Sequence, residues 1–123
     1  MGPRYGLLGL AHPHPRHYGT FPRLLGIYVR ERKIIALEEA VRRATSFGAQ
    51  RLGIRDLGIL RLGMFADVVV FDEDRVVGAS TYDRPHQFRV GIDHVIVNGE
   101  AVIRNGEHTG ARPGRVLRSY ERG

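Results

Sequence analysis

The chain has 123 residues, 42% of them hydrophobic and 26% charged, which suits one small globular unit and excludes a disordered chain. No apolar run approaches the roughly 18 residues that a transmembrane helix needs, and the first residues lack the basic start and small-residue cleavage site of a signal peptide. Cysteine is absent, which excludes disulfides and thiolate metal sites and leads us to expect a cytoplasmic protein.

The formal net charge is +6, from 19 Lys and Arg against 13 Asp and Glu. A basic balance is typical of proteins that bind polyanions. Here, however, the arginines are spread along the whole chain with no block of five like charges, whereas phosphate recognition usually gathers its cations on one face. The charge pattern therefore argues against nucleic-acid binding.

Apolar residues spaced three and four apart predict a first helix over residues 20–30. Thr20 is the predicted N-cap, and Pro22 would lie in the first turn, where its missing N–H costs little. Gly26 should weaken the middle of this helix by about 1 kcal/mol relative to alanine. We expect the aromatic residues of the apolar face, such as Phe21, to pack in the core rather than stack on nucleic-acid bases.

A second helix is predicted over residues 37–46 and is expected to end at Gly48. Glu39 lies in its first turn, where the helix dipole favours an anion, and Arg43 follows four residues later on the same face. A short helical turn is predicted at residues 50–52, before the glycine at position 53.

Beyond that glycine the spacing is that of strands and turns. Residues 59–60 are predicted to form a short strand, and residues 62–64 a turn. The run at 67–72 is four apolar residues between two aspartates and predicts a buried strand. The polar stretch 73–91 is predicted to be a long surface loop.

The clearest local signal is a hairpin. Two apolar runs, 95–97 and 101–103, flank Asn98-Gly99, a dipeptide that tolerates the positive φ angles of a tight turn. Asn105-Gly106 is expected to close the second strand, and the tail from Gly110 is expected to be extended. So few short strands cannot bury both of their faces alone. The helices, a partner chain or sequence absent here must supply the cover.

Three segments occur in a specific order: HPHPRHYGTFPRLLGIYVRE (12–31), LEEAVRRATSFGAQRLGIRDLGILRLGMFADVVVFD (37–72) and HVIVNGEAVIRNGEHTGARPGRVLR (94–118). Together they resemble the C-terminal third of the N-acyl-D-amino-acid deacylases (D-aminoacylases) of the amidohydrolase superfamily. The stretch from AQRLG to VVVFD resembles a general superfamily ending. The HPR-x-x-G-T-F-P-R and G-E-H-T-G-A-R-P-G-R motifs narrow the resemblance to the deacylase branch.

The resemblance implies a mixed α/β fold with a helical N-terminal half and an antiparallel β C-terminal half. In that family a TIM barrel carries the metal site, and a small β-sandwich is built from both chain termini. Residues 1–54 would then be the end of the barrel, a loop with two or three helices. Residues 55–123 would be C-terminal strands of the sandwich.

The resemblance also implies a chemistry. A divalent metal, usually zinc, lowers the pKa of a bound water, and an aspartate acts as general base in the hydrolysis of N-acyl-D-amino acids. That aspartate would precede the HPHPR segment, yet this chain has no aspartate before Asp56. The family's metal ligands would also lie upstream. We therefore expect a C-terminal fragment that binds no zinc and catalyses nothing alone.

Three residues of the HPHPR segment are candidates for a site. His12 and His14 have the H-x-H spacing of a metal site, but prolines interleave with them and no further ligand lies nearby, so we disfavour metal binding. Arg16 follows in the same loop and is our candidate for binding a substrate carboxylate, which suits its planar guanidinium. We expect Asp67 and Asp72, which lie at strand ends, to bond turn amides rather than to form a facing acid/base pair, and we interpret His108 as a turn residue.

Two alternatives remain open, a non-catalytic β-rich dimerisation or interaction module and a basic nucleic-acid binder. As partners we expect the small-molecule substrate in a complete enzyme, and a second copy or a barrel-bearing chain, but no membrane.

Overall fold

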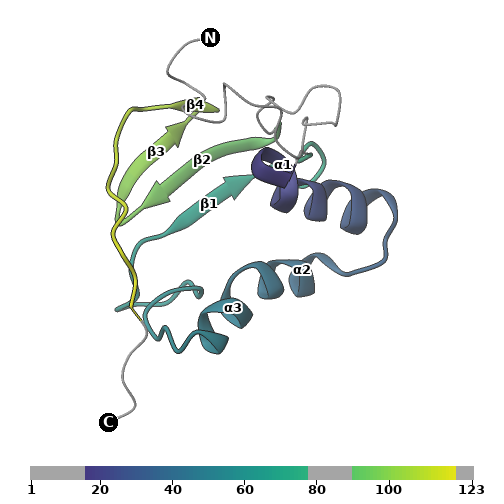
Figure 1. Ribbon diagram of the computed structural model, residues 1–123. Coiled ribbons are helices and arrows are strands. Elements are labelled where there is room, and N and C mark those ends of the chain that lie inside the picture. Colours follow the sequence, from purple (N-terminus) through teal and green to yellow (C-terminus); the bar gives the residue numbers. More distant parts are fainter. Residues whose placement is uncertain (1–15, 78–89, 119–123) are drawn as a thin grey trace.

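A computed structural model describes residues 16–77 and 90–118 of the chain. Its helices are α1 (Arg16–Arg23), the π-helix η2 (Leu24–Glu31), α2 (Leu37–Ala44) and α3 (Ser46–Arg51). Its strands are β1 (Val68–Phe71), β2 (Ile92–Val97), β3 (Glu100–Arg104) and β4 (Glu107–His108), which form one antiparallel sheet in the order β1-β2-β3-β4. The helices lie beside this sheet (Figure 1), so the predicted mixed α/β fold is confirmed.

The first helix begins earlier than predicted. Thr20 lies inside α1, so its prediction as an N-cap is wrong, and Pro22 lies near the end of α1 rather than in its first turn. A proline removes one helical N–H and crowds the carbonyl four residues before it. Directly after it the backbone continues as the wider π-helix, a form that accommodates such interruptions. Phe21 is 60% exposed, because nothing in the described part of the chain covers that face.

The second helix starts where predicted but ends at Ala44. Thr45 leaves helical geometry, with φ −131° and ψ −92°, and its hydroxyl donates to the Val41 carbonyl at 2.7 Å. The third helix then runs through Gly48, so the prediction that Gly48 ends a helix is wrong. The predicted stop at Gly53 is confirmed, since this residue has φ +71° and donates its N–H to the last helical turn.

The segment between α3 and β1 is irregular. The predicted strand at residues 59–60 is wrong: within the described ranges no strand pairs with it, and Gly58 bends the chain there with φ +91°. The turn at residues 62–64 is confirmed, with Gly63 at φ +85°.

The predicted hairpin is confirmed. Asn98 and Gly99 have φ +50° and +78°, the conformation that an Asn-Gly turn between β2 and β3 requires. Asn105 and Gly106 repeat it at φ +51° and +79° and lead into β4. His108 therefore lies in a strand, so its prediction as a turn residue is wrong.

The core of this chain is small. The apolar residues that the described segments bury are Ala40, Val76 and Ile103. The prediction that β1 is buried is wrong for this chain, because Val69 is 53% exposed and Val70 44%. Helices pack mainly on helices and strands on strands, so neither layer fully covers the other.

One joint ties the two halves together. The Arg30 guanidinium in η2 donates to the carbonyls of Glu73 and Val76, both at 3.0 Å, just beyond the end of β1. Gly26 lies so close to this segment that an added Cβ would fall 2.3 Å from the Val76 carbonyl oxygen. Gly91 approaches Val76 from the side of the sheet, where an added Cβ would fall 2.5 Å from its nitrogen. None of the helices among the described residues is long and apolar enough to cross a membrane.

Candidate functional site

The residues that the sequence singles out lie mostly at the margin of the described structure. His12 and His14 are outside the described residues. Arg16 is the first residue of α1, and its backbone alone is placed. The binding role of Arg16 therefore stays a prediction.

The two aspartates that bracket β1 bond to backbone amides, as predicted. The Asp67 carboxylate accepts the N–H of Asn98 at 2.8 Å, which holds the β2–β3 turn against the start of β1. The Asp72 carboxylate accepts the N–H of Asp74 at 2.9 Å and caps the turn that follows the strand. These local roles leave no facing acid/base pair between the two carboxylates.

The histidines of the sheet are also engaged by turns. Nδ1 of His94 accepts the N–H of Asn105 at 3.4 Å, and Nδ1 of His108 accepts that of Gly110 at 2.9 Å. Across residues 16–77 and 90–118 no group of three or more His, Cys, Asp or Glu residues could hold a metal ion. Because zinc sites in proteins need three or four such ligands, the described residues do not fit one.

Two ion pairs form a network on the surface of α2. Glu39 accepts hydrogen bonds from Arg42 at 2.7 Å and Arg43 at 2.8 Å. These bonds, first from Arg42 and then from Arg43, lower the pKa of Glu39 from its ordinary 4.5 to about 2. The Glu39 side chain is 34% exposed, and its two partners lie on the same helix, so these bonds secure a helix surface rather than activating an acid.

A hollow of about 250 Å³ opens where the helices meet the segment after β1. Its lining combines apolar side chains with charges of both signs, from Leu25, Val29, Arg30, Lys33, Leu37, Glu73, Asp74 and Val76. Arg30 is already bonded to backbone carbonyls, and the mixed charges favour neither an anion nor a cation. The hollow belongs to the joint between the two halves.

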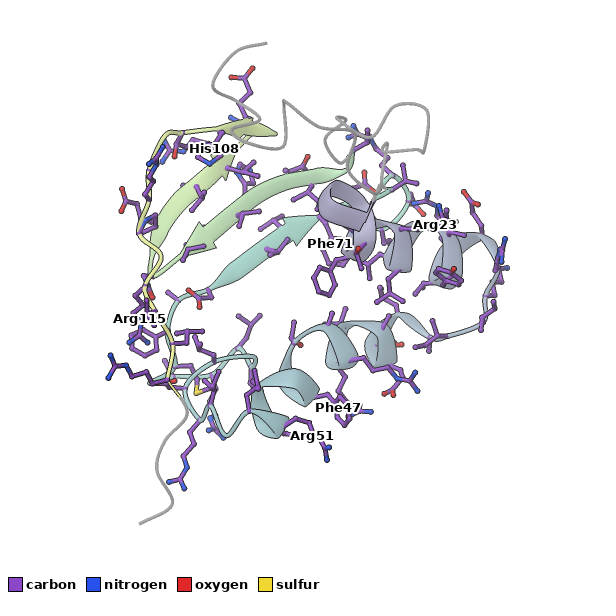
Figure 2. The ribbon with its side chains drawn as sticks, in the orientation of Figure 1. Arg23, Phe47, Arg51, Phe71, His108 and Arg115 are labelled. Carbon is purple, nitrogen blue, oxygen red and sulfur yellow. The ribbon has the colours of Figure 1, made fainter. Side chains whose placement is uncertain are left out.

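Sequence reasoning missed the contacts that fasten the loops to the sheet. The Asn98 side-chain amide donates to the Pro113 carbonyl at 2.6 Å. The Arg115 guanidinium stacks on the Phe65 ring, 3.7 Å from its centroid, and Figure 2 shows Arg115 at the end of the sheet opposite His108. An Asn-Gly dipeptide predicts a hairpin turn, but it does not indicate which distant carbonyl the asparagine side-chain amide will bond.

The sequence and the fold of this chain were compared with those of known proteins. Residues 7–103 match the Amidohydrolase family. The chain is 49% identical over 113 residues to the N-acyl-D-glutamate deacylase of Alcaligenes xylosoxydans xylosoxydans, a match that covers 92% of this chain and 23% of that protein. It is 45% identical over 112 residues to the D-aminoacylase of the same organism, covering 89% and 23%.

Solved structures agree. The crystal structure of D-aminoacylase superposes with a TM-score of 0.85 at 42% identity, covering 87% of this chain and 23% of that one. The N-acyl-D-glutamate deacylase of Bordetella bronchiseptica, solved with zinc and a phosphonate mimic of the tetrahedral intermediate, superposes at 0.82 with 47% identity, covering 89% and 23%. The chain thus spans about a quarter of the length of these relatives. Sequence and structure together show that it belongs to the amidohydrolase family.

Proposed function

We propose that the chain serves as one structural segment of a metal-dependent amidohydrolase that hydrolyses N-acyl-D-amino acids. The observation that carries this proposal is the 49% identity over 92% of the chain to a deacylase of which it spans only 23%. A match that covers nearly the whole chain, helices and strands included, favours a structural role within a larger enzyme.

The two halves of the chain would play different parts in that enzyme. Residues 1–54 would be the end of the catalytic barrel, and residues 55–123 would contribute strands to the small β-sandwich. The order of elements supports this division, because the helices end at Arg51 and the strands begin at Val68. The irregular segment between them would be the connection.

The chain alone would not catalyse hydrolysis. The described residues do not assemble metal ligands, and their aspartates at the ends of β1 are bonded to turn amides. The test is to incubate the purified chain with zinc and N-acetyl-D-glutamate and to measure release of free amine. We expect no release above a zinc-only control, and steady release by the chain would refute the claim.

The same assay can be run with a complementary piece. A truncated N-acyl-D-glutamate deacylase, lacking the part that this chain matches, is mixed with the chain in the presence of zinc. We expect hydrolysis from the mixture and from neither component alone. Failure of every such mixture to hydrolyse N-acyl-D-glutamate, N-acyl-D-aspartate or N-acyl-D-methionine would argue against the proposed role.

Arg16 would bind the substrate carboxylate in the assembled enzyme. Every N-acyl-D-amino acid carries an α-carboxylate, and the guanidinium fork can pair with it through two parallel hydrogen bonds. In the reconstituted mixture Arg16→Gln should raise KM by about 10- to 100-fold with a smaller change in kcat. Arg23→Gln, on the exposed last turn of the same helix, is the matched control and should change neither. An unchanged KM for Arg16→Gln would remove this role.

A further inference from the structure

The chain has two asparagines, and both lie in the same tripeptide, Asn-Gly-Glu, at residues 98–100 and 105–107. Asparagine before glycine is prone to deamidation, because glycine has no side chain to shield its backbone nitrogen from the asparagine amide. The two turns also share a backbone conformation: φ is +50° and +51° at the asparagines, and +78° and +79° at the glycines. Their local reactivity is therefore matched, and a difference between them must come from the fold.

Deamidation requires the glycine nitrogen to be free. This nitrogen loses its proton to hydroxide and attacks Cγ of the asparagine, the bond from Cγ to the side-chain nitrogen breaks, and ammonia leaves. Water then opens the cyclic imide at one of its two carbonyls, which gives isoaspartate or aspartate. In the closed turns both nitrogens are engaged, since Gly99 donates to the Ala66 carbonyl at 2.9 Å and Gly106 to the Asp93 carbonyl at 2.8 Å. The rate therefore depends on how often each turn opens.

The turn at Asn98 is tied to distant parts of the chain. Its backbone N–H donates to the Asp67 carboxylate at 2.8 Å, a bond that the charge of the acceptor strengthens. Its side-chain amide donates to the Pro113 carbonyl at 2.6 Å, which holds Cγ in place in a half-buried position. The turn also joins two long strands, β2 with six residues and β3 with five. Opening this turn must break both of these additional bonds.

The turn at Asn105 is held more loosely. Its backbone N–H donates to Nδ1 of His94 at 3.4 Å, a long and weak bond. Within residues 16–77 and 90–118 its side-chain amide has no hydrogen-bond partner, and the residue is exposed. The strand that follows, β4, has two residues and lies at the edge of the sheet. This turn therefore opens at a lower free-energy cost.

We propose that Asn105 is a site of spontaneous deamidation and that the fold protects Asn98 from the same reaction. Isoaspartate at position 105 would lengthen the main chain by one methylene between β3 and β4 and would place a negative charge two residues before Glu107. A tight two-residue turn cannot absorb an additional main-chain atom without changing its shape. The modification would therefore release β4 from β3 as the protein ages.

The first test compares the two asparagines in one sample. The full chain is incubated in mildly alkaline buffer, folded or in urea, and a glutamate-specific protease then cuts at Glu100 and Glu107, which separates the two sites. Mass spectrometry measures the conversion of each asparagine, and methyl transfer by an isoaspartyl O-methyltransferase detects isoaspartate. One hydrogen bond slows opening by about 2- to 10-fold, so the two additional bonds of Asn98 predict a rate at Asn105 about 10-fold higher or more.

The sample in urea is the control for local sequence. Once the turns are unfolded, the two rates should agree within about 3-fold. Equal rates in the folded chain, or a faster reaction at Asn98, would overturn the inference. A preference for Asn105 that is as large in urea as in the folded chain would also overturn it, because the preference would then come from neighbouring residues rather than from the fold.

Amide hydrogen exchange by NMR measures the opening directly. The Gly106 amide should exchange about 10-fold faster than the Gly99 amide or more, and equal protection would remove the physical basis of the proposal. After ageing, protection of the Thr109 amide, which donates to the Val102 carbonyl at 2.9 Å beyond β4, should be lost in the isoaspartate fraction. Asn105→Gln disfavours closure of the imide ring and should keep this protection. Full protection of Thr109 in the isoaspartate fraction would refute the release of β4.

Discussion

Gly26→Ala tests the joint between the helices and the sheet. An added Cβ would lie 2.3 Å from the Val76 carbonyl oxygen and 3.1 Å from Cα of Val77, so backbone on one side must move. Overpacking of this kind costs about 1 to 3 kcal/mol. A shift would also weaken the partly buried hydrogen bond from Arg30 to Val76, a further loss of about 1 kcal/mol. Alanine recovers about 1 kcal/mol of helix propensity, so the net loss of unfolding free energy should be about 1 to 3 kcal/mol.

Gly48→Ala is the matched control. It also replaces a helical glycine, but nothing lies within 4 Å of the added Cβ. The free energy of unfolding should therefore rise by about 0.5 to 1 kcal/mol. Urea unfolding followed by far-UV circular dichroism measures both variants against the unaltered chain. If Gly26→Ala unfolds at the same urea concentration as Gly48→Ala, or higher, the close approach at the joint does not govern its stability.

Three further predictions concern the surface and the turns. Because the pKa of Glu39 is lowered to about 2, the stability that the ionised carboxylate contributes is fully present above about pH 4.5 and is lost as the pH falls toward 2. An NMR titration of the Glu39 carboxyl carbon should show this low midpoint. Glu39→Gln should remove this part of the acid dependence of stability. Asn98→Gly keeps the turn but deletes the hydrogen bond to the Pro113 carbonyl. It should therefore lower the free energy of unfolding by about 0.5 to 1.5 kcal/mol more than Asn105→Gly, the control at a residue with the same backbone conformation. Equal losses of unfolding free energy in the two variants would contradict this. Arg115→Gln should lower the free energy of unfolding by about 0.5 to 1 kcal/mol because it removes the contact with the Phe65 ring, whereas Arg118→Gln should leave it unchanged. The chemical shifts of the Phe65 ring protons should change in the first variant and not in the second.

Local chemistry explains which parts of the fold could be predicted. The hairpin depends on Asn98-Gly99, whose backbone conformation is set by the residues themselves, and its turn lies at the predicted residues. The strands on either side are longer than predicted. The start of α2 likewise follows from its own apolar spacing and its first-turn acids. Turns and helix starts that depend on a few neighbouring residues can therefore be predicted without knowing the tertiary structure.

Tertiary context explains the errors. Gly26 was interpreted as a weak point of a helix, yet its missing side chain is what lets η2 approach Val76. The four apolar residues of β1 correctly predict a strand, but Val69 is half exposed, because the described residues do not cover it. Both cases depend on what packs against the residue, which periodicity does not encode.

The candidate site shows the same limit. The motifs around Arg16 were enough to predict the family, which the comparisons confirm. The position of its side chain relative to a substrate depends on barrel strands that these residues do not form. Its role therefore stays a prediction, to be tested in the reconstituted enzyme.

The most direct test of the central claim is the zinc content of the purified chain. The claim is that the residues of this chain do not themselves supply the ligands for a catalytic metal. After incubation with zinc and exhaustive dialysis, elemental analysis should find far less than one zinc ion per chain, and a bound ion should be retained only in complex with the truncated relative. One zinc ion retained per isolated chain, with several histidine or carboxylate ligands in its X-ray absorption spectrum, would contradict the account.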